Sequence, residues 1–454
     1  MKRCLLTISL ALATLGASAQ NRKAAKRAAR VQVSAVTVAR VLTTLAADDM
    51  QGRGTGQPGG LKAAQFLASE FQRIGLQPLP GATGFEQVFP VYESPVTALS
   101  ATLNGAVVPA DKLLLFSNQP TLEWTNQTPA IEVLTIGPEE KPMQFVGRIM
   151  RPSQNLVVLL DPAHADVFKR LQNANRQPRL RTTEAGNAYS SVLVMTSADS
   201  KTAKNTTNTT FAVQGKTQQR VVELRNVVGV LPGQDSARIR EKVVFSGHYD
   251  HLGVIKPNVA GDSIANGADD DASGTTAVVA LAEYFKQRSD NARPLIFTAL
   301  AAEEVGGFGA RHFSQQLDPN QVVAMFNIEM IGKLAKFGPN TAFITGFEKS
   351  DFGPLLQANL AGSKFRFEPD PYPTQNLFYR SDNATLAKLG VPAHTISSDQ
   401  IPDDKLYHSV DDEVESLNLP NMTAIIQAIA QSASGIVAGK QTPTRIAPEP
   451  AVTK

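Results

Sequence analysis

The chain has 454 residues, of which 42% are hydrophobic and 19% charged, with 32 glycines and 28 prolines. This composition excludes collagen-like, fibrous and wholly disordered proteins, and the length is ample for a full core without disulfides. The 44 basic and 41 acidic side chains leave a formal charge of only +3. Nucleic-acid phosphates require a clustered basic surface, which this balance does not suggest, so we expect no nucleic-acid partner.

Residues 1–19 are typical of a secretory signal peptide. Lys2 and Arg3 precede a short apolar run, which ends in a small-residue cleavage site at Ala19. The run is too short to span a bilayer comfortably, so we do not expect an integral membrane protein. We expect export to a periplasm or to the medium, and the signal does not distinguish these two locations.

The cysteine content limits the chemistry of any metal site. Cys4 is the only cysteine, and it lies within the predicted signal peptide. Cleavage after Ala19 would leave a chain that can form no disulfide and offer no thiolate. A metal site in the mature protein must therefore be built from histidine and carboxylate side chains.

The first half of the chain predicts a helical segment followed by a β-rich insertion. The run from Leu61 to Leu79 carries apolar residues at helical spacing and is interrupted by Gly75 and Pro78. Residues 98–216 alternate short β-like runs with Pro, Asn and Thr, and none of the chemistry described below falls there. We predict an inserted β-rich domain over 98–216, flanked by the two parts of a catalytic domain, 20–97 and 217–440.

From Arg225 onward the chain alternates apolar, β-branched runs with helical stretches. The predicted strands are NVVGVLP, KVVFSGH, PLIFTALAAEE, VVAMFNIEM and AFITG. Continuous apolar strands alternating with helices predict an α/β fold with a mostly parallel sheet covered on both faces. Residues 441–454 are rich in Pro and Thr and are predicted to be a disordered tail.

Histidine and carboxylate side chains follow three of the predicted strands. His248 ends one strand, the pair Glu303 and Glu304 follows the next, and Glu329 follows a third. In open α/β sheets, ligands bind outside the carboxyl ends of the strands. Between the first two strands, the acidic run GADDDASG opens a helix, and His408 stands later in a polar loop.

Each of these features has an ordinary explanation when taken alone. An acidic run before a helix usually caps it, an acidic pair after a strand is usually an exposed loop, and a lone histidine is usually a surface residue. However, the chain has only six histidines, and two of them flank a carboxylate cluster at strand ends. Oxygen-rich ligation with one imidazole per ion and no thiolate suits a pair of divalent ions.

Six ordered motifs resemble those of the co-catalytic zinc aminopeptidases of family M28. They are NVVGVLPG (226–233), GHYDHLG (247–253), GADDDASG (267–274), AAEEVGGFGA (301–310), NIEMIG (327–332) and YHSVDD (407–412). The upstream run DDMQGRGTGQPGGLKAAQFL resembles the start of their catalytic domain, and 98–216 more weakly resembles a protease-associated domain. The resemblance covers about 40–95 and 220–435, and it implies a three-layer α/β/α zinc-exopeptidase fold.

The resemblance also implies two Zn²⁺ ions per chain. The first would be held by His248, Asp270 and Glu329, and the second by Asp270, Glu304 and His408. The family commonly has Asp at the position of Glu329, which puts the metal preference of the first centre in question. The D-x-x-S-G spacing of the family selects Asp270 as the bridging ligand. The neighbouring acids at 269 and 271 are then expected to cap the helix and shape the turn.

The catalytic roles follow from that ligand set. Two ions about 3.5–4 Å apart can share one water and lower its pKa. Glu303 cannot easily be a ligand beside Glu304, because adjacent side chains point apart, so it is the candidate general base and later general acid. Asp250 is expected to accept the imidazole N–H of His248, although it could instead be an ordinary loop carboxylate. Tyr407 matches a family position whose hydroxyl stabilises the oxyanion, although it could instead simply pack on the site.

The sequence therefore predicts a secreted dinuclear zinc aminopeptidase acting on peptides. A carboxypeptidase or dipeptidase is an alternative, in which Arg380 would pair with a substrate carboxylate, although a structural ion pair is its ordinary explanation. A glutaminyl cyclase needs only one metal and is less favoured. A non-catalytic binding protein would be expected to have lost ligands. His251, His312 and His394 are expected to be satisfied or solvated, and the oligomeric state cannot be read from the sequence.

Overall fold

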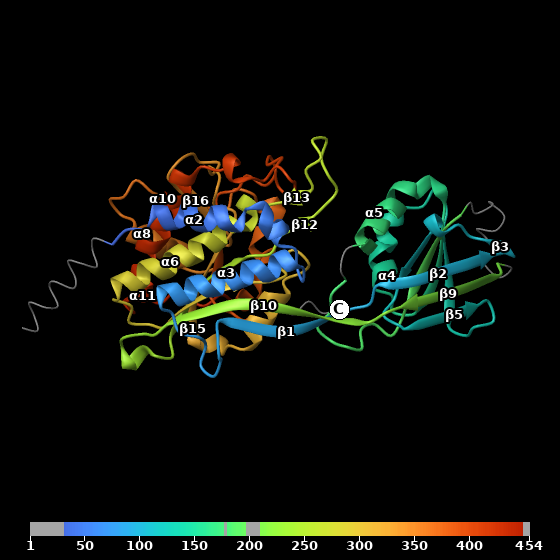
Figure 1. The fold of residues 1–454 in the computed structure, drawn as a ribbon, viewed down its shortest axis with the longest axis horizontal. Coiled ribbons are helices and arrows are strands. Elements are labelled where there is room, and N and C mark those ends of the chain that lie inside the picture. Colours follow the sequence, from blue (N-terminus) through green and yellow to red (C-terminus); the bar gives the residue numbers. More distant parts are fainter. Residues whose placement is uncertain (1–30, 177–178, 197–208, 448–454) are drawn as a thin grey trace, which may run out of the picture. The chain divides into compact units, whose positions relative to one another are not determined.

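The computed structural model describes residues 31–176, 179–196 and 209–447, and it divides into two compact units (Figure 1). One unit contains the described residues up to Phe89 and from Leu224 onward, and the other is Pro90–Glu223. The predicted insertion, 98–216, lies inside the second unit, which is several residues wider at each end. The predicted signal peptide lies outside the described residues.

The first unit is built on an eight-stranded sheet. In spatial order its strands are β1 (Glu86–Glu93), β10 (Arg220–Leu231), β14 (Leu295–Leu300), β11 (Lys242–His248), β15 (Val322–Ile328), β18 (Ala393–Ser397), β16 (Thr341–Ile344) and β17 (Arg366–Pro369). Strands β14, β11, β15 and β18 run parallel at the centre, whereas β10 and β16 pair antiparallel with their inner neighbours. The predicted mostly parallel sheet is confirmed, and β18 is a central strand that the sequence analysis missed.

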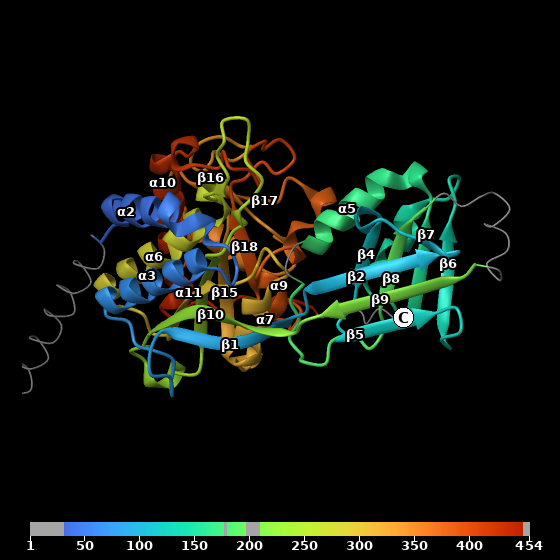
Figure 2. The same cartoon turned by 45° about the vertical axis from the view of Figure 1, so that its right-hand side comes forward.

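Helices cover both faces of this sheet (Figure 2). One face carries α2 (Ala35–Leu45), α3 (Pro58–Ile74), α6 (Gly274–Arg288), α8 (Phe352–Asn359) and α10 (Leu419–Ser432), followed by the short α11 (Ser434–Val437). The other face carries α7 (Phe308–Gln315) and α9 (Asn383–Ala387). The α3 helix ends at Gly75, which has a left-handed φ of 79°, as the sequence predicted. No helix in the described part of the chain is long and apolar enough to cross a membrane.

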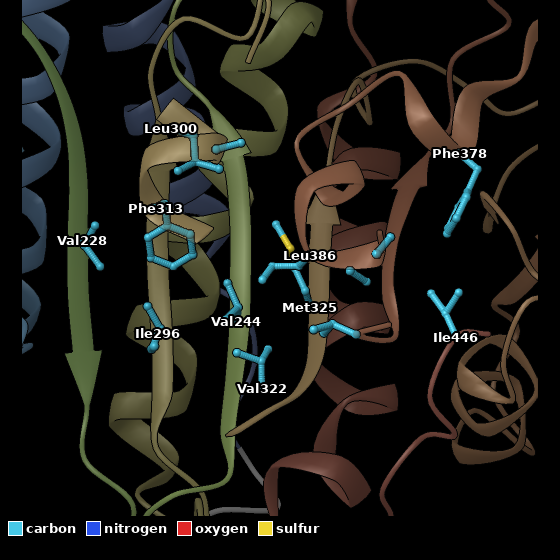
Figure 3. Packing of buried hydrophobic residues seen from close by; sticks show 14 residues of the cluster. Val228, Val244, Ile296, Leu300, Phe313, Val322, Met325, Phe378, Leu386 and Ile446 are labelled. Carbon is cyan, nitrogen blue, oxygen red and sulfur yellow. The ribbon is translucent and has the colours of Figure 1, made fainter. Parts of the chain in front are cut away.

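Neighbouring strand residues point to opposite faces and fill both layers of the core. Val244 and Ile296 face the side of α7 and α9, where they lie in one cluster with Phe313 (Figure 3). On the opposite face, Phe245 stacks on Phe297 with 5.3 Å between the ring centres. Because both faces are buried, the strands read as continuous apolar runs, and their carboxyl ends are held by a rigid core.

The second unit contains two four-stranded sheets. The first consists of β3 (Ala106–Val107), β2 (Val96–Leu103), β9 (Phe211–Thr217) and β5 (Thr121–Thr125). The second consists of β4 (Leu113–Phe116), β8 (Ser191–Met195), β7 (Asn155–Leu160) and β6 (Ile131–Ile136), with helices α4 (Val146–Met150) and α5 (Ala165–Arg176). Strands β2 and β9 pair antiparallel, so that Val96 lies opposite Thr217. The unit thus holds its own two ends together.

The disorder expected for 441–454 does not extend over 441–447. Ile446 is 4% exposed and belongs to the core cluster beside the sheet, and Arg445 donates hydrogen bonds to the carbonyls of Pro319 and Val322. The fully buried Arg293 donates to the hydroxyl of Thr442 at 2.5 Å. The Pro- and Thr-rich composition predicted a disordered tail. Composition contains no information on the contacts of single side chains, and here a few such contacts hold the extended segment in place.

Candidate metal centre

The parallel strands bring the predicted ligands to one edge of the sheet. His248 is the last residue of β11, Glu304 follows β14, and Glu329 follows β15 directly. Asp270 lies in the turn Ala268–Ser273, which leads into α6. His408 stands in the loop after β18, with its imidazole close to the same carboxylates. All five predicted ligands thus lie around this edge.

Asp270 stands at the centre of the cluster and faces two imidazoles. Its Oδ1 lies 3.3 Å from Nε2 of His248, and its Oδ2 lies 3.2 Å from Nε2 of His408. Glu304 Oε2 lies 3.1 Å from the same His408 nitrogen. Two donor atoms bound to one tetrahedral zinc at 2.0–2.1 Å are about 3.3 Å apart. A carboxylate that presents a different oxygen to each imidazole has the arrangement of a bridging ligand.

The tautomer of His248 leaves a lone pair directed at the cluster. Its Nδ1 lies 3.1 Å from the backbone carbonyl of Asp250, and a carbonyl only accepts, so this nitrogen carries the hydrogen. Its Nε2 is buried and has no hydrogen-bond partner among the described residues. A lone pair that faces a carboxylate oxygen needs a proton or a cation between them. The donor set therefore fits zinc, which takes imidazole and carboxylate ligands.

The position of Asp250 corrects one expectation. The carboxylate was expected to accept the imidazole N–H, but its Oδ1 lies 3.9 Å from Nδ1 of His248, and the backbone carbonyl takes that bond instead. The carboxylate accepts from the backbone N–H of Glu303 at 3.1 Å and from the hydroxyl of Thr55 at 2.7 Å. The Asp250 carboxylate is therefore too far from the imidazole to orient it. Its hydrogen bonds instead fix the segment that carries the candidate base.

His251 lies in the site, although the sequence analysis gave it no role. It is fully buried, and its Nδ1 lies 2.7 Å from Oε1 of Glu304 and 3.8 Å from Oδ2 of Asp270. The imidazole donates to Glu304, which leaves the other oxygen of that carboxylate facing His408. By contrast, His394 is a core histidine bonded to Ser350, and its pKa is lowered to about 4 by burial. His312 stacks on Phe89.

Glu329 and Tyr407 line the remaining wall of the cluster. With Asp270 and Glu303 they border a small hollow of about 70 Å³. Among the described residues Glu329 forms no ion pair with His248, so the first predicted centre is less closely assembled than the second. The ring of Tyr407 stacks on the ring of His408 with 3.8 Å between their centres. Tyr407 therefore packs against a ligand while it also borders the hollow.

The adjacent carboxylates Glu303 and Glu304 have opposite pKa shifts. Burial raises the pKa of Glu303 well above its usual value, with further repulsion from Glu329 and opposed by His248. For Glu304, burial and Asp270 oppose ionisation, but hydrogen bonds from His251 and His408 outweigh them and lower its pKa. Burial thus favours the neutral form of Glu303, whereas the two imidazoles favour the charged form of Glu304, and such opposite shifts separate a base from a ligand.

The raised pKa of His408 reflects the negative charge around its imidazole. Burial disfavours the imidazolium of His408, but hydrogen bonds to Asp270 and Glu304 prevail and raise its pKa to about 10. Ligand histidines must be neutral to bind a metal, so a cation would replace this proton. The cluster thus has the excess of negative charge that a divalent ion would neutralise.

Neighbouring acids fix the backbone around the ligands. Asp271 accepts from the backbone N–H groups of His248, Gly274 and Met330, which joins β11, α6 and the segment after β15. Asp412, four residues after His408, accepts from the N–H groups of Asp269 and Asp270. The capping expected of the acidic run is confirmed at Asp271. This carboxylate also joins three segments that are distant in sequence.

Arg53 is a buried residue that the sequence analysis did not single out. Its side chain is fully buried, and its guanidinium donates to the backbone carbonyls of Leu45, Tyr249, Asn266, Gly267 and Asp270. Burial lowers its pKa, while Asp270 and other nearby carboxylates oppose that shift. In the sequence, Arg53 is one residue of the run DDMQGRGTGQPGG, and nothing in that run distinguishes it from its neighbours. Arg53 ties the two ligand-bearing loops to the N-terminal segment.

Three non-glycine residues beside the ligands have a left-handed backbone. Ala302 has a φ of 61°, Met330 a φ of 52° and His408 a φ of 58°. Such conformations cost about 1–3 kcal/mol each and persist where the surrounding structure determines them. They stand next to Glu303, next to Glu329 and at a ligand, so the strained positions coincide with the site.

Known proteins are similar to this chain in sequence and in fold. Two curated fungal proteins, each named "Probable zinc metalloprotease", are similar over short stretches. The one from Pyricularia oryzae is 40% identical over 95 residues, 21% of this chain and 18% of that protein. The one from Pyrenophora teres f. teres is 34% identical over 113 residues, 24% of this chain and 23% of that protein. The alignments thus span less than a quarter of these relatives.

Solved structures are similar over most of the chain. The aminopeptidase from Aneurinibacillus sp. strain AM-1 has a TM-score of 0.54 at 17% identity, covering 92% of this chain and 97% of that one. A zinc aminopeptidase from Bacillus subtilis has a TM-score of 0.54 at 14% identity, covering 90% and 96%. These likenesses confirm the fold. Residues 226–433, which contain all five predicted ligands, match the model of peptidase family M28.

Proposed function

We propose that this protein is an exported zinc metallopeptidase, an aminopeptidase that removes N-terminal residues from peptides with two zinc ions per chain. One observation carries the proposal: Asp270 faces two imidazoles through different oxygens, and Glu303 borders the same hollow. The family match and the names of the fungal relatives support zinc peptidase chemistry. Export rests on residues 1–19 alone.

The ligands would be His248, Asp270, Glu304, Glu329 and His408. Zinc bound there would lower the pKa of a shared water and polarise the scissile carbonyl. Glu303 takes the proton of that water and later delivers it to the leaving amine, and its raised pKa suits both steps. Burial and four nearby carboxylates also raise the pKa of Tyr407, so its hydroxyl stays protonated and can donate to the oxyanion.

Paired substrates test the proposal directly. Zinc-loaded protein should hydrolyse di- and tripeptides with a free amine, and N-acetylation should abolish the cleavage. Chelation should lower the rate by at least about 10²-fold and zinc should restore it, because the water then loses its activation. The measurement is release of free amino acid, with chelated protein as control. Cleavage that survives complete removal of zinc would refute the zinc mechanism.

Recognition of the substrate's carboxyl end is the alternative that one observation favours. Arg380 was expected to form a structural ion pair, but within the described part of the chain its guanidinium makes two long contacts, to the backbone and side-chain oxygens of Gln375, both at 3.4 Å. It has no acidic partner within ion-pair distance among the described residues, and it borders the hollow beside Glu303. Arg380 is therefore available to a substrate carboxylate.

Replacement of Arg380 separates the two alternatives. If acetylated and free peptides are cleaved equally, R380Q should raise KM about tenfold for free-acid peptides and leave their amides unaffected, because a charge-assisted bond is lost. The measurement is steady-state kinetics on matched acid and amide substrates. An equal change in KM for acid and amide would contradict carboxyl-end recognition.

A further inference from the structure

A second and larger hollow adjoins the first at Glu303. It has a volume of about 550 Å³ and lies between α7 and the segment from Tyr379 to Leu389. It shares Glu303, Arg380 and Ser381 with the small hollow of about 70 Å³ that contains Asp270. The candidate base therefore stands where the two hollows meet.

The walls of this larger cleft are held by the fold. Helices α7 and α9 pack against each other, and the hydroxyls of Ser314 and Thr385 are hydrogen-bonded across them at 2.6 Å. Both residues border the cleft, together with the small side chains of Ala310 and Ala384. The cleft is therefore a preformed feature of two packed helices.

Three cationic side chains border the cleft without an acidic partner. Among the described residues, none of Arg311, Arg380 and Lys388 has a carboxylate within ion-pair distance. Arg311 donates to the backbone carbonyl of Gly306, and its guanidinium lies 4.4 Å from the ring centre of Phe308. The Lys388 ammonium lies 5.5 Å from the ring centre of Tyr379. Most of their hydrogen-bond donors thus remain available to a ligand.

The acidic groups of the cleft do not cancel this positive charge. They are Glu303 and Asp382. Asp382 is 2% exposed and neither of its oxygens has a hydrogen-bond partner in the described structure; burial, the largest effect, raises its pKa to about 7. Three cations therefore border the cleft against two acids, so positive side chains outnumber negative ones on its walls.

The volumes indicate which side of a peptide each hollow receives. An aminopeptidase holds a single residue before the scissile bond, which suits the hollow of about 70 Å³ with apolar walls that include Phe343, Leu377 and Ile401. The rest of the peptide lies beyond the bond and needs the larger cleft. Glu303, between the two, is placed to deliver a proton to the amine that leaves.

We propose that the larger cleft is a subsite for a carboxylate on the leaving-group side, so that preferred substrates carry an acidic group after the scissile bond. This inference rests on the proposed peptidase function. Arg311 and Arg380 have planar guanidinium groups that can bind a carboxylate through two N–H donors, whereas Lys388 supplies a point charge. The carboxylate can belong to an acidic side chain or to the C terminus of a short peptide.

Matched peptides separate these sources. The full-length, zinc-loaded protein is assayed on Leu-Ala-Ala-amide, Leu-Glu-Ala-amide and Leu-Ala-Ala with a free C terminus. We expect kcat/KM to be roughly tenfold higher for at least one carboxylate peptide than for the neutral amide. A preference for Leu-Glu-Ala-amide identifies a side-chain carboxylate as the ligand. A preference for Leu-Ala-Ala with a free C terminus identifies the terminal carboxylate. The preference should shrink at high salt, because exposed charges are screened.

Two variants test the cleft itself. R311Q and K388Q should each lower the ratio of carboxylate to neutral kcat/KM by about threefold or more. K364Q removes an exposed lysine that does not border the cleft, and its ratio should equal that of the wild type. The inference is wrong if the neutral amide is cleaved as efficiently as the carboxylate peptides. It is also wrong if both variants keep the wild-type preference for carboxylate peptides. In either case the peptidase proposal stands. If no peptide is cleaved, both fail.

Discussion

Replacement of Glu303 by glutamine is expected to lower kcat/KM by about 10²–10⁴ while the zinc content stays unchanged. Glutamine keeps the shape of the side chain but cannot take a proton from water. The backbone N–H of residue 303 would still donate to Asp250, so the loop should keep its position. The measurement combines peptide kinetics with metal analysis of the purified variant.

The neighbouring carboxylate provides a matched control. E304Q should lose zinc as well as activity, because the carboxylate oxygens of Glu304 face His251 and His408 at 2.7 and 3.1 Å. The two variants differ by one position and remove the same charge, so a difference in zinc content separates base from ligand. Loss of zinc from E303Q, or activity close to that of the wild type, would overturn the assignment.

Replacement of Arg53 by methionine is expected to lower the free energy of unfolding by about 3–5 kcal/mol. The change leaves buried carbonyls, including those of Tyr249 and Gly267, without their donor. It also removes a positive charge beside Asp270, whose carboxylate would then be less compensated. Urea denaturation of the metal-free protein measures the loss, and zinc titration should show weaker binding.

Two further variants control for charge and for the loss of a long side chain. R53K keeps the positive charge but lacks the planar set of N–H donors of a guanidinium, so its free energy of unfolding should fall between those of R53M and the wild type. R40M removes a half-exposed arginine of α2 that pairs with the buried Glu70 of α3, and it should cost only about 1 kcal/mol because Arg73 still binds that carboxylate. A change below about 1 kcal/mol for R53M would contradict the role of Arg53.

The parts of this protein that the sequence predicts are those that depend on short-range patterns. The strand β11 is a continuous apolar run because both faces of the sheet are buried. His248 is its last residue, so it stands at the edge of the sheet where the ligands gather. Asp270 could be chosen from a family spacing, and in the structure it faces two imidazoles. The strand pattern was sufficient for the first inference, and the family resemblance was needed for the second.

The features that the sequence did not predict depend on contacts between distant segments. His251 follows His248 by three residues, but only the fold places its ring against Glu304. The carboxylate of Asp250 binds the N–H of Glu303 because two strand ends meet there, which no spacing records. Arg53 lies about 200 residues before the loops whose carbonyls it binds. Such long-range partners have no local signature.

The paired ends of the inserted unit have a consequence for the order of folding. Strands β1 and β10 are neighbours in the main sheet, yet most of the second unit lies between them along the chain (Figure 1). If that unit were unfolded, pairing β1 with β10 would close a loop that includes the 122 positions from Val96 to Thr217. Once β2 has paired with β9, only a few residues at each end remain to be closed.

The entropy of loop closure grows with the logarithm of loop length, at about 0.6 kcal/mol for each doubling. Shortening the loop from 122 residues to roughly eight removes about four doublings, or about 2.4 kcal/mol. An inserted unit that folds first thus makes its two flanking strands nearly local neighbours. The main sheet can then assemble as though the insertion were a short turn.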